Sequence, residues 1–415
     1  MRAADVLRLL PNRPPAPYGV ARLARAASIE DLAALARRRL PAAARAYLDG
    51  GGEDEYTLRR NRAAFDDIEL VPRALRDVST LDTATTILGG TTPLPIALAP
   101  VGAPRFLHHE AELAVTRAAA AAGVPYAIST VGSVPIERIA AEADTDLWLQ
   151  LYVAGDRRDT DALVDRAASA GCRALVLTAD VTVRSKRERE LDAGLGLPQP
   201  HPRVSTVIDA LGHPVWLWHF LAGRFPGFPN VNPSAADTAA RVDLSDLFDG
   251  TACWDDLEHL RHRWNGPLAL KGILSPADAR RAVDAGIDAV IVSNHGGRQL
   301  DHLPATIDVL PGIVDAVGDD AEVLLDSGIR RGTDIVAALA LGARAVLVGR
   351  AYLYGLAAAG EAGVRHAIDV LADELRTTLA LVGAASLDEL GPDLVRLVDV
   401  RPQPGGRRGG ADVRH

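Results

Sequence analysis

His295 stands in a segment whose composition suits acid-base chemistry. It lies in SNHGGRQLD (293–301), with two glycines and then Arg298 directly after it. An imidazole accepts a proton near neutral pH, and a buried carboxylate such as Asp180 would orient the ring and stabilise its charged form. Arg298 and Arg187 would bind a carboxylate, because a guanidinium pairs with that group through two parallel hydrogen bonds. These residues predict a general base beside a binding site for an acid.

Lysine is rare in this chain. Lysines and arginines together number 45, and only Lys186 and Lys271 among them are lysines. The two exceptions are informative, since lysine presents one compact charge where arginine presents a planar fork. Lys271 ends the apolar run LALKG (268–272), so we expect a buried stem and an ammonium at the end of the run. It is either a Schiff-base nucleophile or a fixed positive charge beside a group that becomes anionic. Lys186 is either a second charge near the substrate or a solvated side chain.

Two glycine-rich segments have the composition of a phosphate site. DSGIRRG (326–332) offers glycine N–H groups, a hydroxyl and Arg330, and Gly349 with Arg350 offers a second close backbone approach and a second cation. Glycines let the backbone come near a phosphate, and guanidinium groups pair with it. Together with Lys271, they predict a flat, phosphate-bearing cofactor that gains negative charge on reduction, such as flavin mononucleotide (FMN). Pyridoxal phosphate would also explain a lysine beside a phosphate, but it accounts less well for His295 and for the pair Arg187 and Arg298.

These side chains need a scaffold that brings distant segments together. Short apolar, β-rich runs alternate with segments whose apolar residues recur at helical spacing, such as 109–123, 159–171, 275–286 and 331–342. The pattern predicts a (β/α)8 barrel, in which catalytic residues lie at the carboxyl ends of the strands. An open doubly wound sheet is the alternative, but it usually has fewer strands and a glycine-rich first turn. The eight runs are 95–100, 126–130, 147–152, 174–180, 268–272, 288–293, 322–327 and 344–350.

Some parts of the chain lie outside the repeat. Residues 1–27 are predicted to be an N-terminal extension, and 28–400 the barrel domain, which begins with a cap that contains a helix over 29–48. Residues 191–250 interrupt the repeat after the fourth strand and are rich in proline, glycine and aromatic residues, which is typical of a lid. The tail, 401–415, is predicted to be disordered.

Composition excludes several classes of protein. With 415 residues, 48% of them hydrophobic, 24% charged and a formal net charge of −9, the chain is predicted to be neither disordered nor a nucleic-acid-binding protein. Cys172 and Cys253 are too few for a disulfide scaffold and have no partner at metal-ligand spacing, so we expect no metal site and a reducing cytoplasm. No apolar stretch has the length of a transmembrane helix. The aromatic residues within 209–229 leave peripheral contact with a membrane open.

At the level of whole motifs, the chain resembles the FMN-dependent L-2-hydroxy acid oxidases and dehydrogenases, the family of glycolate oxidase, lactate oxidase, mandelate dehydrogenase and flavocytochrome b2. The resemblance covers about residues 28–392 outside the 191–250 segment. Val101 and Ser327 depart mildly from it, since many relatives have threonine and glycine there. The resemblance depends on the joint, ordered occurrence of AYLDGGGEDEYTLRRN (46–61), QLYV (150–153), LKG (270–272), SNHGGRQLD (293–301), DSGIRRGTD (326–334) and the GR of 349–350.

The resemblance implies a role for each matching position. His295 removes a proton with Asp180 as its partner, and Lys271 faces the N1/O2 edge of the flavin, where it stabilises the reduced anion. For the substrate, the resemblance implies contacts from Tyr47, Tyr152, Arg187 and Arg298. For FMN, it implies contacts from Pro100, Val101, Gly102, Ser129, Gln150, Thr178, Lys271, Ser293, Asp326, Ser327, Gly328, Arg330, Gly349 and Arg350.

The implied reaction is oxidation of a lactate-, glycolate- or mandelate-like L-2-hydroxy acid to the 2-oxo acid. His295 takes either the hydroxyl proton, with hydride passing to flavin N5, or the α-proton, which leaves a carbanion. Oxygen, a quinone or a cytochrome then accepts the electrons. The alternative is a relative that oxidises an amine or a peptide-borne substrate, but Arg298 counts against it because that arginine serves a free carboxylate. The common assembly in the family is a homotetramer.

Overall fold

Eight parallel strands form a closed barrel in the computed structural model, which describes residues 20–398 except 196–202, 223–226, 232–246 and 249. The strands pair in chain order, and the last pairs with the first. Each coincides with one of the eight predicted runs, so the predicted (β/α)8 barrel is confirmed. Residues 1–19 of the predicted extension and the whole tail, 401–415, lie outside the described residues. The strands are β4 (Ile96–Leu98), β5 (Tyr126–Ser129), β6 (Leu147–Leu151), β7 (Ala174–Thr178), β8 (Leu268–Ile273), β9 (Ala289–Val292), β10 (Glu322–Leu325) and β11 (Ala345–Val348).

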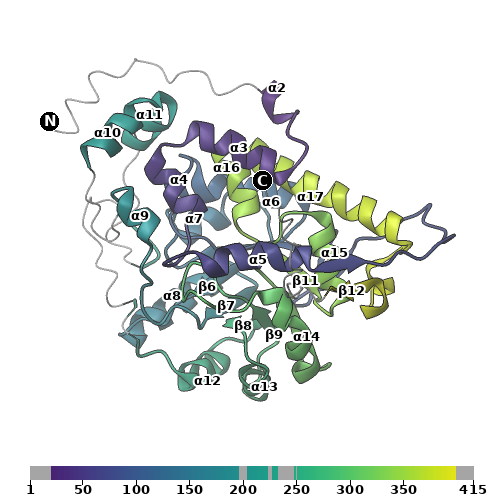
Figure 1. Ribbon diagram of the computed structural model, residues 1–415. Coiled ribbons are helices and arrows are strands. Elements are labelled where there is room, and N and C mark those ends of the chain that lie inside the picture. The colour runs from purple at the N-terminus through teal and green to yellow at the C-terminus, as the bar shows by residue number, and fades with distance from the viewer. Residues whose placement is uncertain (1–19, 196–202, 223–226, 232–246, 249, 399–415) are drawn as a thin grey trace, which may run out of the picture.

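Helices connect the strands and cover the outside of the barrel (Figure 1). Local signals set their ends. Ser275 caps the helix after β8 by accepting from the Asp278 N–H, with Pro276 at the first helical position, and Gly123 ends the helix after β4 at φ +67°. The four predicted helices correspond to α6 (Ala111–Ala122), α8 (Arg157–Ser169), α13 (Pro276–Asp284) and α15 (Gly332–Ala340). The others of this layer are α7 (Ile136–Ala140), α12 (Trp254–Arg263), α14 (Thr306–Val317), α16 (Arg350–Ala359) and α17 (Glu361–Val382).

The barrel interior is filled mainly by small side chains. Alternate strand residues turn inward, and most of them are alanines packed around the single large ring of Trp148. The hairpin of β2 (Thr85–Ile87) and β3 (Gly90–Thr92) closes the amino-terminal end, where Arg173 donates to the carbonyls of Ile87 and Leu88. The filled interior leaves the opposite end, where the strands finish, as the place for a site.

The cap before the barrel differs from the single predicted helix. Two helices, α3 (Ile29–Arg39) and α4 (Ala42–Asp49), replace it, because Pro41 lacks the N–H that a continuous helix needs and disfavours helical backbone at Leu40. Leu40 (ψ 140°) and Pro41 (ψ 163°) are both extended. The resulting bend brings α4 over the barrel mouth. A third helix, α5 (Tyr56–Asp66), follows, and β1 (Ile68–Leu70) then pairs with β12 (Val395–Leu397) near the other end of the described chain.

The 191–250 segment is less irregular than expected. Its described part contains the end of α9 (Glu188–Asp192), then α10 (Val204–Leu211) and α11 (Pro214–Ala222). On α11, Trp216 is buried against Phe106 and Phe220, and its Nε1 donates to the Phe106 carbonyl over 2.9 Å. Helix α11 thus packs on the loop that follows β4.

Exposed apolar side chains of this segment lie on α10, whereas α11 carries buried ones. Val204, Val207, Ile208 and Leu211 are all exposed, whereas Trp216 and Leu217 on α11 are buried. Of the aromatic residues that suggested a membrane contact, Trp216 is therefore packed inside the protein, against Phe106 and Phe220. Within the described part of the chain, no helix combines the length and apolar character needed to cross a membrane.

Candidate active site

A pocket lies where the barrel strands end, and it gathers most of the predicted site residues. Gln150, Thr178, Asp180 and Ser293 do not line the pocket but lie behind its wall in a hydrogen-bonded layer. The predicted residues that line the pocket are Tyr47, Pro100, Val101, Gly102, Ser129, Tyr152, Arg187, Lys271, His295, Arg298, Asp326, Ser327, Gly328, Arg330, Gly349 and Arg350.

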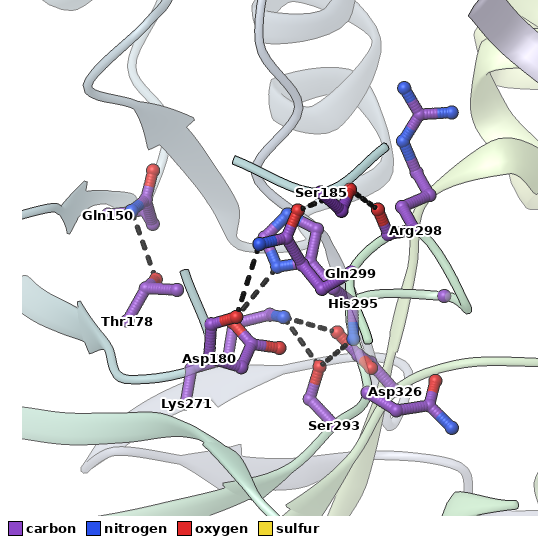
Figure 2. Close-up of polar contacts among 12 residues, drawn as sticks. Gln150, Thr178, Asp180, Ser185, Lys271, Ser293, His295, Arg298, Gln299 and Asp326 are labelled. Carbon is purple, nitrogen blue, oxygen red and sulfur yellow. Dashed lines mark hydrogen bonds and ion pairs between the residues drawn. The ribbon is translucent and has the colours of Figure 1, made fainter. Parts of the chain in front are cut away.

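His295 and Asp180 form the predicted pair. Nδ1 of His295 lies 3.0 Å from Oδ1 of Asp180, which leaves Nε2 as the nitrogen that can accept a proton (Figure 2). His295 has φ +59°, an unfavourable conformation for a histidine, and its N–H donates to Ser293 Oγ over 3.1 Å. Gly272 makes room for the pair, because a Cβ there would lie 2.7 Å from Cβ and Cγ of Asp180.

The charges around His295 favour its neutral form. Burial lowers its pKa, repulsion from Lys271 and Arg187 lowers it further, and Asp180 opposes both effects without outweighing them. Burial would raise the pKa of Asp180, but attraction to His295 and Lys271 outweighs it, so that pKa is lowered and the carboxylate stays charged. The pair therefore consists of a neutral base and an anionic partner at neutral pH.

Asp180→Asn is expected to change both the rate and its pH dependence. In the unaltered enzyme, kcat/KM should fall with acidity only below the ordinary histidine pKa of about 6.5, since His295 must be neutral to act. Removing the carboxylate removes the group that raises the pKa of His295, so the acid limb should move to lower pH while the plateau falls by about 10²-fold. Stopped-flow FMN reduction between pH 4.5 and 8 measures both, and a limb that moves to higher pH would contradict the assignment.

Lys271 is buried as an ion pair. Its side chain is 4% exposed, and Nζ lies 2.8 Å from Oδ2 of Asp326 and donates to Ser293 Oγ over 2.6 Å (Figure 2). Burial would lower the pKa of Lys271, but attraction to Asp326 and Asp180 outweighs it and raises the pKa. A lysine held as ammonium is a poor Schiff-base nucleophile, which favours the fixed-charge alternative. The sequence did not indicate the pairing of Lys271 with Asp326.

Three polar side chains form a row along neighbouring strand ends. Ser129 on β5 donates to Gln150 Oε1 on β6 over 3.2 Å, and Gln150 Nε2 donates to Thr178 Oγ1 on β7 over 3.0 Å. The strand register places Ser129 beside Gln150 and Thr178 beside Lys271. All three are buried. Of this row, Ser129 lines the pocket, and Gln150 and Thr178 support it from behind, so the row offers a polar wall to a polar ring.

Another part of the pocket wall is formed by the cations Arg330 and Arg350. Arg350 donates to the carbonyls of Leu48, Gly50 and Gly296, and Arg330 donates to the Ile329 carbonyl. Among the described residues, neither guanidinium is ion-paired with a carboxylate. Burial, with repulsion from Arg298 and Arg330, lowers the pKa of Arg350 to about 9.

Partly buried cations without a carboxylate partner favour an anion. Ser327 and Gly328, at φ +78° and +91°, shape the loop there, and Ser327 Oγ holds it by donating to Asp326 Oδ1 and accepting from the Gly296 N–H. A cationic region that suits a phosphate, a fixed ammonium and a polar wall, all at one pocket, fit FMN.

The two predicted carboxylate-binding arginines converge on an acid that sequence reasoning missed. Arg298 Nη2 lies 2.8 Å from Oε1 of Glu190, and Arg187 Nη1 lies 3.6 Å from the same oxygen. Glu190 is 1% exposed, and its Oε2 is buried without a hydrogen-bond partner. Arg298 also stacks on Tyr47, 5.0 Å from the ring centroid, and the Tyr47 hydroxyl donates to the Gly102 carbonyl. The sequence signal was the acidic residue three positions after Arg187, at helical spacing.

Two further basic residues of this loop differ in their surroundings. Lys186 is exposed, pairs with Glu188 over 2.6 Å and is not part of the pocket wall, which supports the solvated alternative. Arg184, for which no role was predicted, does line the pocket.

Comparisons with known proteins agree with this geometry. Residues 36–397 match the family model described as FMN-dependent dehydrogenase. The chain is 43% identical over 393 residues to a putative L-lactate dehydrogenase of Mycobacterium tuberculosis, covering 94% of each chain, and 42% identical over 370 residues to an L-lactate dehydrogenase of Ectopseudomonas mendocina, covering 88% of this chain and 97% of the other.

Solved structures show the same likeness. A structure of the monotopic membrane protein (S)-mandelate dehydrogenase is similar with a TM-score of 0.84 and 38% identity, covering 89% of this chain and 99% of the other. A mandelate oxidase variant with (S)-mandelic acid is similar with a TM-score of 0.74 and 40% identity, covering 87% and 96%. The chain therefore belongs to the family of FMN-dependent dehydrogenases, and FMN is its cofactor.

Proposed function

We propose that this enzyme oxidises an L-2-hydroxy acid to the 2-oxo acid. The observation that carries the proposal is the meeting, in one pocket, of His295, whose pKa is lowered, with the guanidinium groups of Arg187 and Arg298 and the side chain of Tyr47. The names of the relatives support the substrate class, since they include lactate and mandelate enzymes. An amine or peptide-borne substrate is less well supported, because it lacks the free carboxylate that the two arginines would bind.

Each residue contributes a separate part of the chemistry. Arg187 and Arg298 orient the substrate carboxylate, so that the hydroxyl-bearing carbon lies near His295. His295 Nε2 takes the hydroxyl proton, and Asp180 stabilises the imidazolium that results. Bound FMN supplies the two-electron acceptor, for which hydride transfer to N5 is the route we favour. Lys271 places a positive charge where negative charge develops, which requires no rearrangement during the reaction.

The remaining wall accommodates an apolar substrate side chain. Tyr152 and Phe248 meet edge to face with ring centroids 5.4 Å apart, and both line the pocket together with Val181 and Phe228. Burial raises the pKa of Tyr152, and the charge of Asp180 raises it further, so its hydroxyl stays protonated and can donate to the substrate. These contacts suit substrates from lactate to mandelate in size.

Anaerobic mixing with a panel of small, branched and aromatic L-2-hydroxy acids tests the proposed function. At least one should bleach the yellow FMN absorbance, while its D-enantiomer and the matching amino acid should not. Admitting air then distinguishes oxygen from the other electron acceptors. Rapid recovery of the yellow colour indicates an oxidase, and slow recovery indicates a dehydrogenase that uses a quinone or a cytochrome. A panel that leaves the absorbance unchanged would refute the proposed function.

We also propose a cytoplasmic, homotetrameric enzyme. The two cysteines support a reducing compartment, because both are free thiols in the structure, with Cys172 buried and Cys253 exposed. The exposed apolar face of α10, Val204, Val207, Ile208 and Leu211, is the better-supported place for a peripheral membrane contact than the aromatic stretch. Cell fractionation and light scattering, with flavin absorbance as the marker, measure location and assembly.

A further inference from the structure

Arg184 is a third guanidinium at the end of the pocket that holds Arg187 and Arg298. It lines the pocket and reaches solvent at the rim. Among the residues that the structure describes, it has no hydrogen bond and no ion pair, whereas Arg187 and Arg298 are both hydrogen-bonded and near Glu190. Its charge nevertheless acts on this group, attracted by Glu190 and repelled by Arg298 and Arg187.

The backbone around Arg184 is held in place although the side chain is not. On one side, the Val183 carbonyl accepts from Gln299 Nε2 over 3.1 Å. On the other, Ser185 Oγ donates to the Arg298 carbonyl over 2.6 Å (Figure 2). The loop therefore presents Arg184 at a defined position, and ordering its side chain on a ligand would cost only side-chain entropy.

The charges of the pocket do not balance at this end. Asp180 is the carboxylate beside His295, Asp326 offsets Lys271, and Arg330 and Arg350 would hold the cofactor phosphate. Three guanidinium groups remain at the substrate end, and Glu190 is the carboxylate in contact with two of them. A substrate carboxylate held by Arg187 and Arg298 leaves Arg184 without an anionic group in contact with it, whereas a dianion would supply one. Desolvation lowers the pKa of Arg184, and attraction to Glu190 does not outweigh that effect.

We propose that Arg184 binds a second anionic group of the substrate, so that the preferred substrate is an L-2-hydroxy acid with a second carboxylate at the far end of its side chain. The inference rests on the proposed function, and it narrows the substrate class within it. The methylene groups between the two carboxylates would pack against Val181 and Phe248, which line the same pocket.

Chain-matched substrates test the proposal on the FMN-bound enzyme. Anaerobic FMN reduction is followed with L-malate against L-2-hydroxybutyrate, and with L-2-hydroxyglutarate against L-2-hydroxypentanoate. We expect kcat/KM to favour at least one diacid by about 10-fold or more, the size of one charge-assisted hydrogen bond. The preference should shrink as salt is raised from 50 to 500 mM, because Arg184 lies at the solvent-exposed rim.

Variants then assign the preference to this side chain. Arg184→Gln should raise the KM for the diacid about 10-fold and leave the monoacid within about 3-fold, and Arg184→Lys should keep part of the preference. Lys186→Gln is the matched control, because Lys186 is a nearby exposed cation outside the pocket wall. An unchanged diacid preference in Arg184→Gln, or a monoacid preference in the unaltered enzyme, overturns this inference and leaves the proposed function intact. Bleaching by neither class overturns both.

Discussion

His295→Gln is expected to slow FMN reduction by substrate by about 10³- to 10⁴-fold. Glutamine has a similar volume and retains a polar end, but it cannot take a proton at neutral pH. The substrate carboxylate would still meet Arg187 and Arg298, so the dissociation constant of the substrate should change only a few-fold. Rapid-mixing absorbance under anaerobic conditions separates the two quantities, since the saturation curve yields the binding constant and its limit the reduction rate.

The control for this variant is His259→Gln. His259 is an exposed histidine whose Nε2 lies 2.9 Å from Asp161, so it has the same kind of carboxylate partner without being in the pocket. It should reduce FMN at the normal rate. If His295→Gln also reduced FMN at the normal rate, another group would have to be the base, and the pairing with Asp180 would have no catalytic meaning.

Lys271→Met should be nearly as damaging, for a different reason. Methionine fills the space of the lysine stem but removes the charge that we propose faces the reduced cofactor, and a loss of about 10³-fold in the rate of FMN reduction is expected. The midpoint potential of bound FMN should fall, since the reduced anion loses its cation. Titration with a redox dye measures the potential, and a normal potential would refute the fixed-charge role.

Stability must be separated from chemistry in this variant. Lys271→Met leaves Asp326 buried without its ammonium, which costs about 3–5 kcal/mol of unfolding free energy. The double variant Lys271→Met/Asp326→Asn should recover most of that stability and none of the activity. Lys186→Met provides the control at the other lysine, and neither stability nor rate should change there, because Lys186 is exposed. Recovery of activity in the double variant would mean that Lys271 acts only on the fold.

The local pattern of apolar residues was sufficient to predict the barrel. Each strand is a short apolar run between helical segments, and every run was found where the structure has a strand, because burial on both faces of a parallel sheet demands continuous apolar sequence. Pro41 was a local signal as well, and it should have divided the predicted helix over 29–48. The orientation of α11 could not be predicted from local sequence. Its aromatic residues could have faced either solvent or the barrel, and the contact of Trp216 with Phe106, which is distant in the chain, decides between the two.

By itself, the sequence determined the strand ends and therefore which side chains surround the pocket, since His295, Lys271 and Arg350 each lie next to a run that pattern identifies. Only the tertiary structure decided which charges meet. The distance along the chain from Arg298 to Glu190, or from Lys271 to Asp326, is far beyond any local period, and loop conformation sets both contacts. The same holds for Arg184, whose proposed role depends on a contrast that only the structure shows. Among the described residues it has no hydrogen-bond or ion-pair partner, whereas the nearby Arg187 and Arg298 contact Glu190. Charge balance in a pocket is a property of three-dimensional proximity, because electrostatic energy depends on separation in space and on burial.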